Sequence, residues 1–298
     1  MTTKNTSGAA ESEANPGAIS APVSGEQHRQ RARPMNSVPH PPVYPCKRTE
    51  AGGPVDGTLD KPHWREARPE WLLPATAAPG PGLDALRQRL LGVSCAFERT
   101  GDPRFLQPAE RALGIQPTAF AACWTATHLL VAFQCADRDA WSPYGRRDEP
   151  LYEAEVVEVF LSPTRDVRRY YEFEVSPRGV VFDARVHSPE RDRASMQVDL
   201  SWNCPGLAAT VHADGAVHSR PPDQGVRLGT TRWWSAELAI PFTAFPEAGT
   251  PRPGTEWRAN FYRIDRADPP EFSAWSPTGR SPADFHVPDR FGTLRFVE

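Results

Sequence analysis

The fold is decided by the stretch Tyr152-Glu153-Ala154-Glu155-Val156-Val157-Glu158-Val159-Phe160-Leu161. Side chains alternate between the two faces of a β-strand, so Glu158 shares a face with Val156 and Phe160. A carboxylate between two apolar neighbours is costly to remove from water unless it has a partner. The stretch therefore predicts a strand with one apolar face and one face that mixes aromatic and charged side chains, which favours a binding surface over a catalytic centre.

Composition and charge narrow the class of protein. The chain has 298 residues, of which 39% are hydrophobic, including 14 Phe and 9 Trp, so it can fill a sizeable core without disulfides. Its net charge of -3 predicts neither nucleic acid nor a membrane as a partner. The five cysteines form no CxxC pair and are odd in number, which indicates neither a zinc site nor a fully paired disulfide framework. We expect a monomer.

The N-terminal residues differ in composition from the rest. Residues 1–45 are rich in Ser, Gly, Ala and Pro, which predicts a disordered tail. They lack the continuous apolar segment of a secretory signal, and no other run approaches the length of a membrane span. As written, the sequence predicts a cytoplasmic protein.

Residues 46–298 are predicted to form one domain with an insertion at about residues 79–117. Within this insertion, four leucines recur at helical spacing: Leu83, Leu86, Leu90 and Leu91. A second short helix is predicted at residues 109–113, before Gly114.

Short strands dominate the remainder of the domain. They are predicted at residues 119–125, 129–135, 156–161, 170–175, 180–186, 207–212, 233–240, 258–264 and 293–297. Many of the 33 prolines fall in the loops between them. The pattern predicts an all-β fold, an antiparallel β-sandwich of the jelly-roll kind, with a short helical insertion and a disordered N-terminal tail.

Two neighbouring strands carry a mixture of polar side chains. Alternation predicts a core-facing set of Tyr171, Phe173, Val175, Val180, Phe182, Ala184 and Val186. A turn at residues 177–179 is expected to join the two strands and to gather the other set on one surface: Tyr170, Glu172, Glu174, Asp183, Arg185 and His187. This surface is either a ligand site or an ordinary solvated sheet face with cross-strand salt bridges.

Seven segments occur in an order that resembles the family 9 carbohydrate-binding module. They are Val55-Asp56-Gly57 through Asp60 and Trp64, residues 129–133 with Asp137, and residues 157–160, 234–241, 260–265, 275–278 and 288–294. Members of that family are β-sandwich domains often attached to glycoside hydrolases. The resemblance implies noncatalytic carbohydrate binding that supports carbohydrate catabolism by those hydrolases. It also implies an extracellular or periplasmic location if the protein starts further upstream.

The resemblance also implies a saccharide site. In that family two aromatic rings hold a terminal sugar between them, because a pyranose has an apolar C–H face, and polar side chains bond its hydroxyls. By position the rings fall at Tyr152 and Phe285, the carboxylate at Glu158 and the amide at Asn260. Glu174 stands where sugar-binding members place a basic residue. Nearby side chains could rebuild a site of different specificity: Trp141, Tyr144, Arg263, Trp275 and His286. Trp275 is alternatively a core residue.

Structural calcium is common in the same family. The acids expected to hold it are Asp60, Asp137 and Glu155, which lie near predicted loops but do not form a calcium hand of regular spacing. No organic cofactor is expected.

Two other functions remain open. Related sandwich domains hold haem, and here the axial ligands would be Met196 with His187, His212 or His218, since no CxxCH motif occurs. A glycoside hydrolase would use Glu158 with Glu172 or Glu174 as its acid and base.

Overall fold

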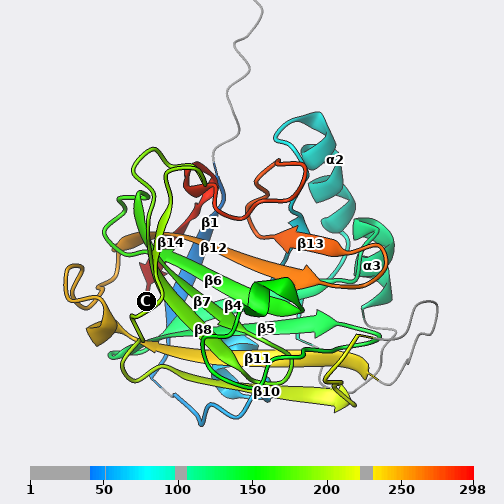
Figure 1. Ribbon diagram of the computed structural model, residues 1–298, viewed down its shortest axis with the longest axis horizontal. Helices are drawn as coiled ribbons and strands as arrows, with labels where there is room; N and C mark the ends of the chain where they lie inside the picture. Colours follow the sequence, from blue (N-terminus) through cyan, green and yellow to red (C-terminus); the bar gives the residue numbers. More distant parts are fainter. Residues whose placement is uncertain (1–40, 51, 98–105, 222–230) are drawn as a thin grey trace, which may run out of the picture. The chain divides into compact units, whose positions relative to one another are not determined.

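The computed structural model describes residues 41–50, 52–97, 106–221 and 231–298 (Figure 1). Within these residues the chain is mostly β-strand, with fourteen strands in one sheet and three short α-helices. This confirms the predicted all-β class. Most of the predicted tail lies outside the described residues.

Eleven of the strands follow one another along a single hydrogen-bonded ladder. Its order is β10 (Ala208–Gly215), β11 (Thr231–Pro241), β5 (His128–Ala136), β4 (Thr118–Trp124), β1 (Val43–Arg48), β14 (Gly292–Val297), β12 (Glu256–Asp265), β6 (Val156–Ser162), β7 (Arg169–Val175), β8 (Val181–His187) and β9 (Gln197–Asp199). The others join at its sides: β13 (Glu271–Ala274) pairs with β12 and β3 (Leu73–Pro74), and β2 (Glu70–Trp71) pairs with β4.

The ladder folds back on itself into two layers. Phe120 on β4 stacks on Phe261 on β12, with ring centroids 4.2 Å apart, although these two strands are not neighbours in the ladder. Phe133 on β5 meets the same ring edge-on at 6.2 Å. The main core therefore lies between the layer that contains β4, β5 and β11 and the layer that contains β6, β7 and β12, which is the predicted sandwich.

The predicted tail extends too far, because its residues 43–45 begin β1. This strand is parallel both to β14, with Val43 opposite Thr293, and to β4, with Lys47 opposite Cys123. Tyr44 and Cys46 are fully buried in the main core. The strand was missed because its partners lie far away in the sequence.

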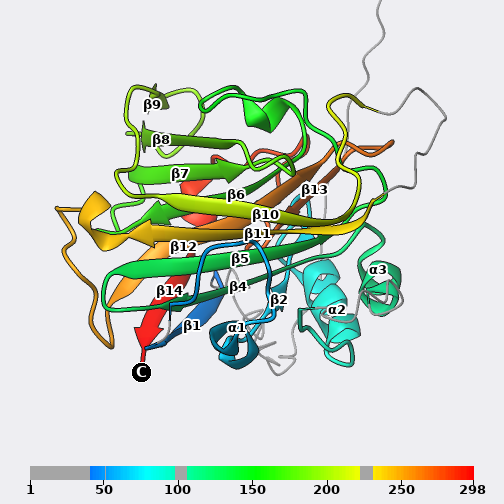
Figure 2. The ribbon, with the colours of Figure 1, turned by 90° about the horizontal axis from the view of Figure 1, so that it is seen from below.

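The predicted helical insertion is confirmed and covers the outer face of β4 and β5 (Figure 2). It contains α2 (Pro81–Leu90) and α3 (Gln107–Leu113), and α1 (Pro62–Glu66) precedes it. Leu83 and Leu86 are buried, as the helical spacing predicts, whereas Leu91 is 77% exposed. The described residues also contain three single-turn 3-10 helices: η2 (Leu151–Glu153), η3 (Phe242–Ala244) and η4 (Pro288–Arg290).

The second layer is buried on both faces, and this corrects the predicted polar surface. On its outer face β7 and β8 place Glu172 opposite Ala184 and Glu174 opposite Phe182, so the glutamates share a face with residues predicted for the core. Asp183 and Arg185 lie instead on the face of Phe173 and Tyr171. Glu172 and Glu174 are 5% and 0% exposed, so they do not form a solvated sheet face.

A buried glutamate attaches residues 55–64 to β11. The carboxylate of Glu237 bonds Lys61 and accepts hydrogen bonds from the Trp64 indole at 2.8 Å and the Gly57 amide at 3.2 Å. Gly57 has a positive φ of 80°, and a Cβ there would lie 2.7 Å from the backbone nitrogen of His212. A glycine is required at this crossing.

Among the described residues, no helix is long and apolar enough to cross a membrane.

Candidate functional site

A pocket of about 390 Å³ opens on the outer face of the second layer. Its apolar lining includes Tyr152, Phe182, Val198, Leu200, Phe272 and Phe285. Its polar lining consists of Glu158, Glu172, Arg193, Arg266, Asp284 and His286. An apolar cavity of this size with a few convergent polar groups has the form of a small-molecule site. The pocket brings together four residues predicted for the saccharide site: Tyr152, Glu158, Phe285 and His286.

The rim of the pocket is unusually apolar for an exposed surface. Tyr152, Val198 and Leu200 are 45%, 38% and 55% exposed, and they are three of the five large hydrophobic side chains exposed among the described residues. Tyr152 meets the ring of Phe182 edge-on at 6.1 Å. Its ring is therefore available at the mouth of the pocket.

Phe285 forms part of the wall and is held from behind. Its ring stacks on Tyr262 at 4.2 Å, nearly parallel, and only 7% of the residue is exposed. The Tyr262 hydroxyl also donates a hydrogen bond to the Phe285 carbonyl at 3.0 Å. Tyr262 thus fixes both the ring and the backbone of Phe285.

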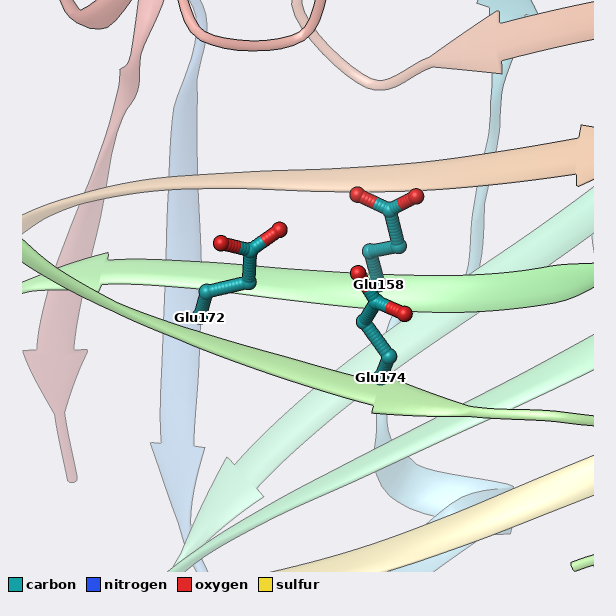
Figure 3. A group of neighbouring side chains, drawn as sticks. All are labelled: Glu158, Glu172 and Glu174. Carbon is teal, nitrogen blue, oxygen red and sulfur yellow. The ribbon is translucent and has the colours of Figure 1, made fainter. Parts of the chain in front are cut away.

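Three carboxylates gather at the floor of the pocket (Figure 3). Glu158 on β6 is the direct cross-strand partner of Glu174 on β7, and Glu172 lies two residues earlier on the same face. One oxygen from each carboxylate lies within 4.8 Å of the others. The period-two geometry of adjacent strands accounts for this grouping. Glu158 and Glu172 line the pocket, and Glu174 is fully buried.

Burial dominates the ionisation of this cluster. It raises the pKa of Glu172 to about 7. It also raises the pKa of Glu158 and Glu174 well above the ordinary value, and the neighbouring carboxylates add to the shift. Within the described part of the chain, Glu158 Oε1 and both oxygens of Glu174 accept no hydrogen bond. Burial and the mutual repulsion of the three carboxyls thus oppose their ionisation, and a bound counter-charge would favour it.

A histidine and two arginines line the same pocket. His286 bonds the Tyr170 hydroxyl at 2.8 Å through Nδ1, and burial followed by the nearby Arg193 lowers its pKa to about 4. Arg193 donates to Asp284 at 3.2 Å, and Arg266 donates to the Tyr152 carbonyl at 2.8 Å. These residues provide hydrogen-bond donors beside the carboxylates.

Asn260, the predicted amide ligand, does not line the pocket. It is fully buried on β12, where its amide nitrogen donates to the Tyr262 hydroxyl at 2.8 Å and to the Ser276 carbonyl at 2.9 Å. Its oxygen accepts from the Ser276 amide at 2.9 Å. The Asn260 amide is therefore connected to Phe285 through the Tyr262 hydroxyl, which it contacts directly.

Three further predicted residues lie away from the pocket. Trp275 belongs to the main core and donates to Glu70 at 2.8 Å, which agrees with the alternative assignment to the core. Arg263 is 1% exposed and bonds Asp137 and Asp265, both at 2.9 Å. Trp141 was predicted as a ring near the site, but it does not line the pocket. Its backbone amide donates a hydrogen bond to the Glu155 carboxylate at 2.9 Å.

The predicted calcium ligands are not brought together. Asp60 is paired with Arg65 at 2.7 Å, while Asp137 bonds Arg263 and the Trp234 indole. In the described ranges, the only group of three or more possible metal-binding side chains is Glu158, Glu172 and Glu174. The donors present therefore do not fit one ion at Asp60, Asp137 and Glu155.

The haem ligands proposed from the sequence are also separated. Met196 lines the pocket, with its sulfur 3.7 Å from the Tyr170 hydroxyl. His187 lines a different cavity, His212 packs against Trp233 with centroids 5.6 Å apart, and His218 pairs with Trp141 in an isolated bridge. None of these three histidines lines the pocket of Met196.

In that second cavity, of about 630 Å³, several of the polar side chains of the lining already pair with one another. Tyr171 bonds Glu247 at 2.8 Å, and Arg185 bonds Asp199 at 2.6 Å. Because these polar groups satisfy one another, the pocket at Glu158 is the better candidate.

The sequence did not reveal several residues of the pocket. Arg193, Val198 and Leu200 lie on the segment around β9, which has no clear strand pattern, and Arg266 and Phe272 flank the turn between β12 and β13. The sequence feature that could have indicated these residues is the pair of large hydrophobic side chains Val198 and Leu200 in an otherwise polar segment.

Comparisons with known proteins agree with this architecture. An "Extracellular protein" of Arthroderma benhamiae is 27% identical over 192 residues, which are 60% of this chain and 78% of that protein. A structure of a Bacteroides uniformis protein proposed to bind carbohydrate superposes with a TM-score of 0.60 at 18% identity, over 86% of this chain and 99% of that one.

A further structure, a family 9 carbohydrate-binding module of Caldicellulosiruptor kristjanssonii in complex with cellotriose, gives a TM-score of 0.46 at 13% identity, over 86% of this chain and 93% of that one. The family model described as "Carbohydrate-binding family 9" matches residues 113–296, more than half of the chain. The matched residues include β4 to β12, most of β14 and all three carboxylates at the pocket floor. The chain therefore belongs to carbohydrate-binding family 9.

Proposed function

We propose that this protein binds a saccharide, without cleaving it, in the pocket beside Tyr152 and Glu158. The observation that carries the proposal is the rim, where Tyr152, Val198 and Leu200 are exposed around a single pocket. Soluble proteins leave few large apolar side chains exposed together unless they bind something there. Membership of carbohydrate-binding family 9 supports a saccharide as the ligand.

Each part of the lining matches a part of a sugar. The accessible ring of Tyr152 offers a stacking surface for the apolar face of a pyranose, and Phe285 supplies a second ring in the wall. Glu158 would accept hydrogen bonds from hydroxyls, and Arg266 and Arg193 would donate to them. This assignment replaces the amide of Asn260 with the two arginines.

An adjoining cavity of about 640 Å³ extends the site. It shares Arg193, Ala283, Asp284 and His286 with the first pocket, and most of its other lining residues are polar. A ligand of more than one sugar unit could place its first ring beside Tyr152 and its next unit along this cavity. We therefore expect an oligosaccharide to bind more tightly than its monosaccharide.

We infer binding without cleavage even though the pocket contains paired acids. Glu158 and Glu172 have oxygens within 4.8 Å, whereas retaining glycosidases place two carboxyl groups about 5–5.5 Å apart on either side of the bond that they cleave. Here both acids come from neighbouring strands at the floor, so both approach a ligand from the same side. Such a module would support carbohydrate catabolism by keeping a glycoside hydrolase close to its substrate.

Calorimetric titration with a panel of gluco-, xylo-, manno- and chito-oligosaccharides tests the proposal. Tyr152→Ala is expected to weaken binding about tenfold, which corresponds to about 1.4 kcal/mol. Leu200→Ala should weaken binding less, and the matched control Leu91→Ala, at an exposed leucine next to α2, should leave it unchanged.

Two results would overturn the proposal. One is the absence of binding to every member of the panel, and the other is unchanged affinity in both Tyr152→Ala and Leu200→Ala. New reducing ends released from the oligosaccharides would contradict noncatalytic binding and favour the hydrolase.

A further inference from the structure

The floor of the pocket concentrates negative charge in a place where strands normally avoid it. Glu158 and Glu174 are directly opposed on β6 and β7, and like charges at such positions destabilise a sheet. All three carboxylates are nearly or fully buried, with Glu158, Glu172 and Glu174 at 2%, 5% and 0% exposure. Buried carboxylates are costly unless a counter-charge or hydrogen-bond donors satisfy them.

The described side chains supply that compensation only in part, because Arg193 and Arg266 lower the pKa of Glu158 but burial and Glu172 raise it by more. Glu158 Oε1 and both oxygens of Glu174 accept no hydrogen bond within the described residues. The two arginines of the pocket are engaged elsewhere, Arg193 with Asp284 and Arg266 with the Tyr152 carbonyl. Nε2 of His286 lies 3.9 Å from Glu172, beyond hydrogen-bond distance. Two carboxylates that are more than nine-tenths buried, Glu158 and Glu174, thus keep unused acceptor oxygens beside Glu172.

The donor set selects the kind of ion that could fill this position. It consists only of carboxylate oxygens, which hard cations such as Ca²⁺, Mg²⁺ and Mn²⁺ prefer, whereas Zn²⁺ favours nitrogen and sulfur ligands. Two oxygens on one Ca²⁺ can lie about 5 Å apart, because each bond is about 2.3–2.6 Å long. On Mg²⁺ the limit is about 4 Å, since its bonds are about 2.0–2.1 Å long. Oxygens that lie within 4.8 Å of one another are compatible with Ca²⁺. Ca²⁺ is the favoured ion because it accepts several carboxylates in flexible geometry, whereas Mg²⁺ demands a near-ideal octahedron.

Access and ligand number are also suitable. Glu158 and Glu172 line the pocket, so an ion can enter from solvent and come to rest against Glu174 behind them. Ca²⁺ takes about six to eight oxygens, and water in the pocket can complete the set. We propose that Glu158, Glu172 and Glu174 form a Ca²⁺ site at the floor of the pocket. The site stands whether or not the pocket also takes a saccharide.

Direct metal titration of the full chain, after removal of divalent ions with a chelator, tests the site. Calorimetry with CaCl₂ at neutral pH is expected to give one Ca²⁺ per chain and a melting temperature that rises with Ca²⁺ concentration. MgCl₂ should bind at least tenfold more weakly. Glu174→Gln and Glu158→Gln should each weaken Ca²⁺ binding at least tenfold. The control Glu256→Gln, at a carboxylate paired with Arg295 at the first residue of β12, should leave it unchanged.

A second measurement needs no variant. Tb³⁺ is a luminescent substitute for Ca²⁺, and its emission is expected to rise on excitation of nearby tyrosines, such as Tyr152 on the pocket wall, and to be displaced by Ca²⁺. No heat, melting shift or displaceable Tb³⁺ emission at millimolar Ca²⁺ would overturn the proposal. Unchanged Ca²⁺ affinity in both glutamate variants would also overturn it, as would a preference for Mg²⁺. Saccharide titration in the presence of chelator keeps this test separate from the proposed function.

Discussion

Two buried glutamates on the sheet have opposite surroundings. Glu237 on β11 is 2% exposed, bonds Lys61, and accepts hydrogen bonds from the Trp64 indole and two backbone amides. Glu174 on β7 is 0% exposed, faces two other glutamates, and accepts no hydrogen bond from the described residues. Burial alone therefore does not say what a carboxylate does.

The ionisation of the two residues follows from this contrast. Burial raises the pKa of both, but at Glu237 the neighbouring His63, Lys61 and Trp64 lower it by more, so its pKa falls below the ordinary value. At Glu174 burial and the adjacent Glu158 act in the same direction, and the pKa is raised. A satisfied buried charge holds the fold together, whereas an unsatisfied one at a pocket indicates a ligand.

The largest change in the free energy of unfolding is expected at Glu237, the glutamate whose hydrogen-bond partners are in place. Glu237→Ala leaves Lys61 buried without its counter-charge and should lower the free energy of unfolding by about 3–5 kcal/mol. Urea denaturation at neutral pH measures the change. As a control, Asp60→Ala removes an exposed pair with Arg65 and should cost less than about 1 kcal/mol. Equal losses in the two variants would contradict the special role of Glu237.

Acid should weaken the same contact. Because the pKa of Glu237 is lowered in the folded state, its contribution is present above the ordinary value of 4.5 and is lost as pH falls through the folded pKa. One proton gives a slope of up to about 1.4 kcal/mol per pH unit below that value. Urea denaturation over a series of acidic buffers should show a shallower slope in Glu237→Gln than in the unmodified chain. An identical slope in both would exclude Glu237 as the titrating group.

The same carboxylate-to-amide change should have the opposite sign at the pocket floor. In the presence of chelator, Glu174→Gln replaces a carboxyl whose ionisation is opposed by burial and by Glu158, so it should raise the free energy of unfolding by up to about 1 kcal/mol, most at alkaline pH. Glu237→Gln, its matched control, should lower it. With Ca²⁺ present, Glu174→Gln should instead be the less stable chain, because it loses the ion. A loss of stability in chelator would show that the carboxylate of Glu174 is satisfied after all.

The smallest effect is expected at the rim. Leu200 is 55% exposed, so Leu200→Ala should change the free energy of unfolding by less than about 0.5 kcal/mol. Leu91→Ala, at 77% exposure, should behave in the same way. Thermal melting compares the two variants. A clear loss confined to Leu200→Ala would mean that the rim packs the fold instead of presenting a binding surface.

Alternation in the sequence predicted most of the long strands, although not β1, β9 or β13, and it did not predict which faces of the sheet would be buried. The strand predicted at residues 156–161 is observed at Val156–Ser162, and the one predicted at 170–175 is observed at Arg169–Val175. The pattern identifies which residues share a face, but it cannot say that both faces of this layer are buried. Glu172 and Glu174 were therefore expected on a polar surface, and the structure places them in a second apolar region with Phe182.

The structure brings only some of the predicted site residues together, for a similar reason. The resemblance assigned Tyr152, Glu158 and Phe285 to positions in the strand order, and all three residues line one pocket. Asn260 occupies its expected strand, but its amide bonds Tyr262 and Ser276, partners that no local pattern reveals. Arg193 and Arg266 come from connecting segments whose paths depend on the whole fold.

The central position of β1 has a consequence for biosynthesis. Residues 43–47 of β1 pair with residues 293–297 of β14. During synthesis this pairing can form only after β14 has left the ribosome, although β1 leaves it much earlier. Until then its edge toward β14 has no neighbour, and exposed strand edges invite pairing with other chains. Nascent chains that stop before Gly292 should therefore be cleaved more readily by proteases, and bound more by chaperones, than chains that contain β14. A tag inserted within β14 should lower the yield of soluble protein.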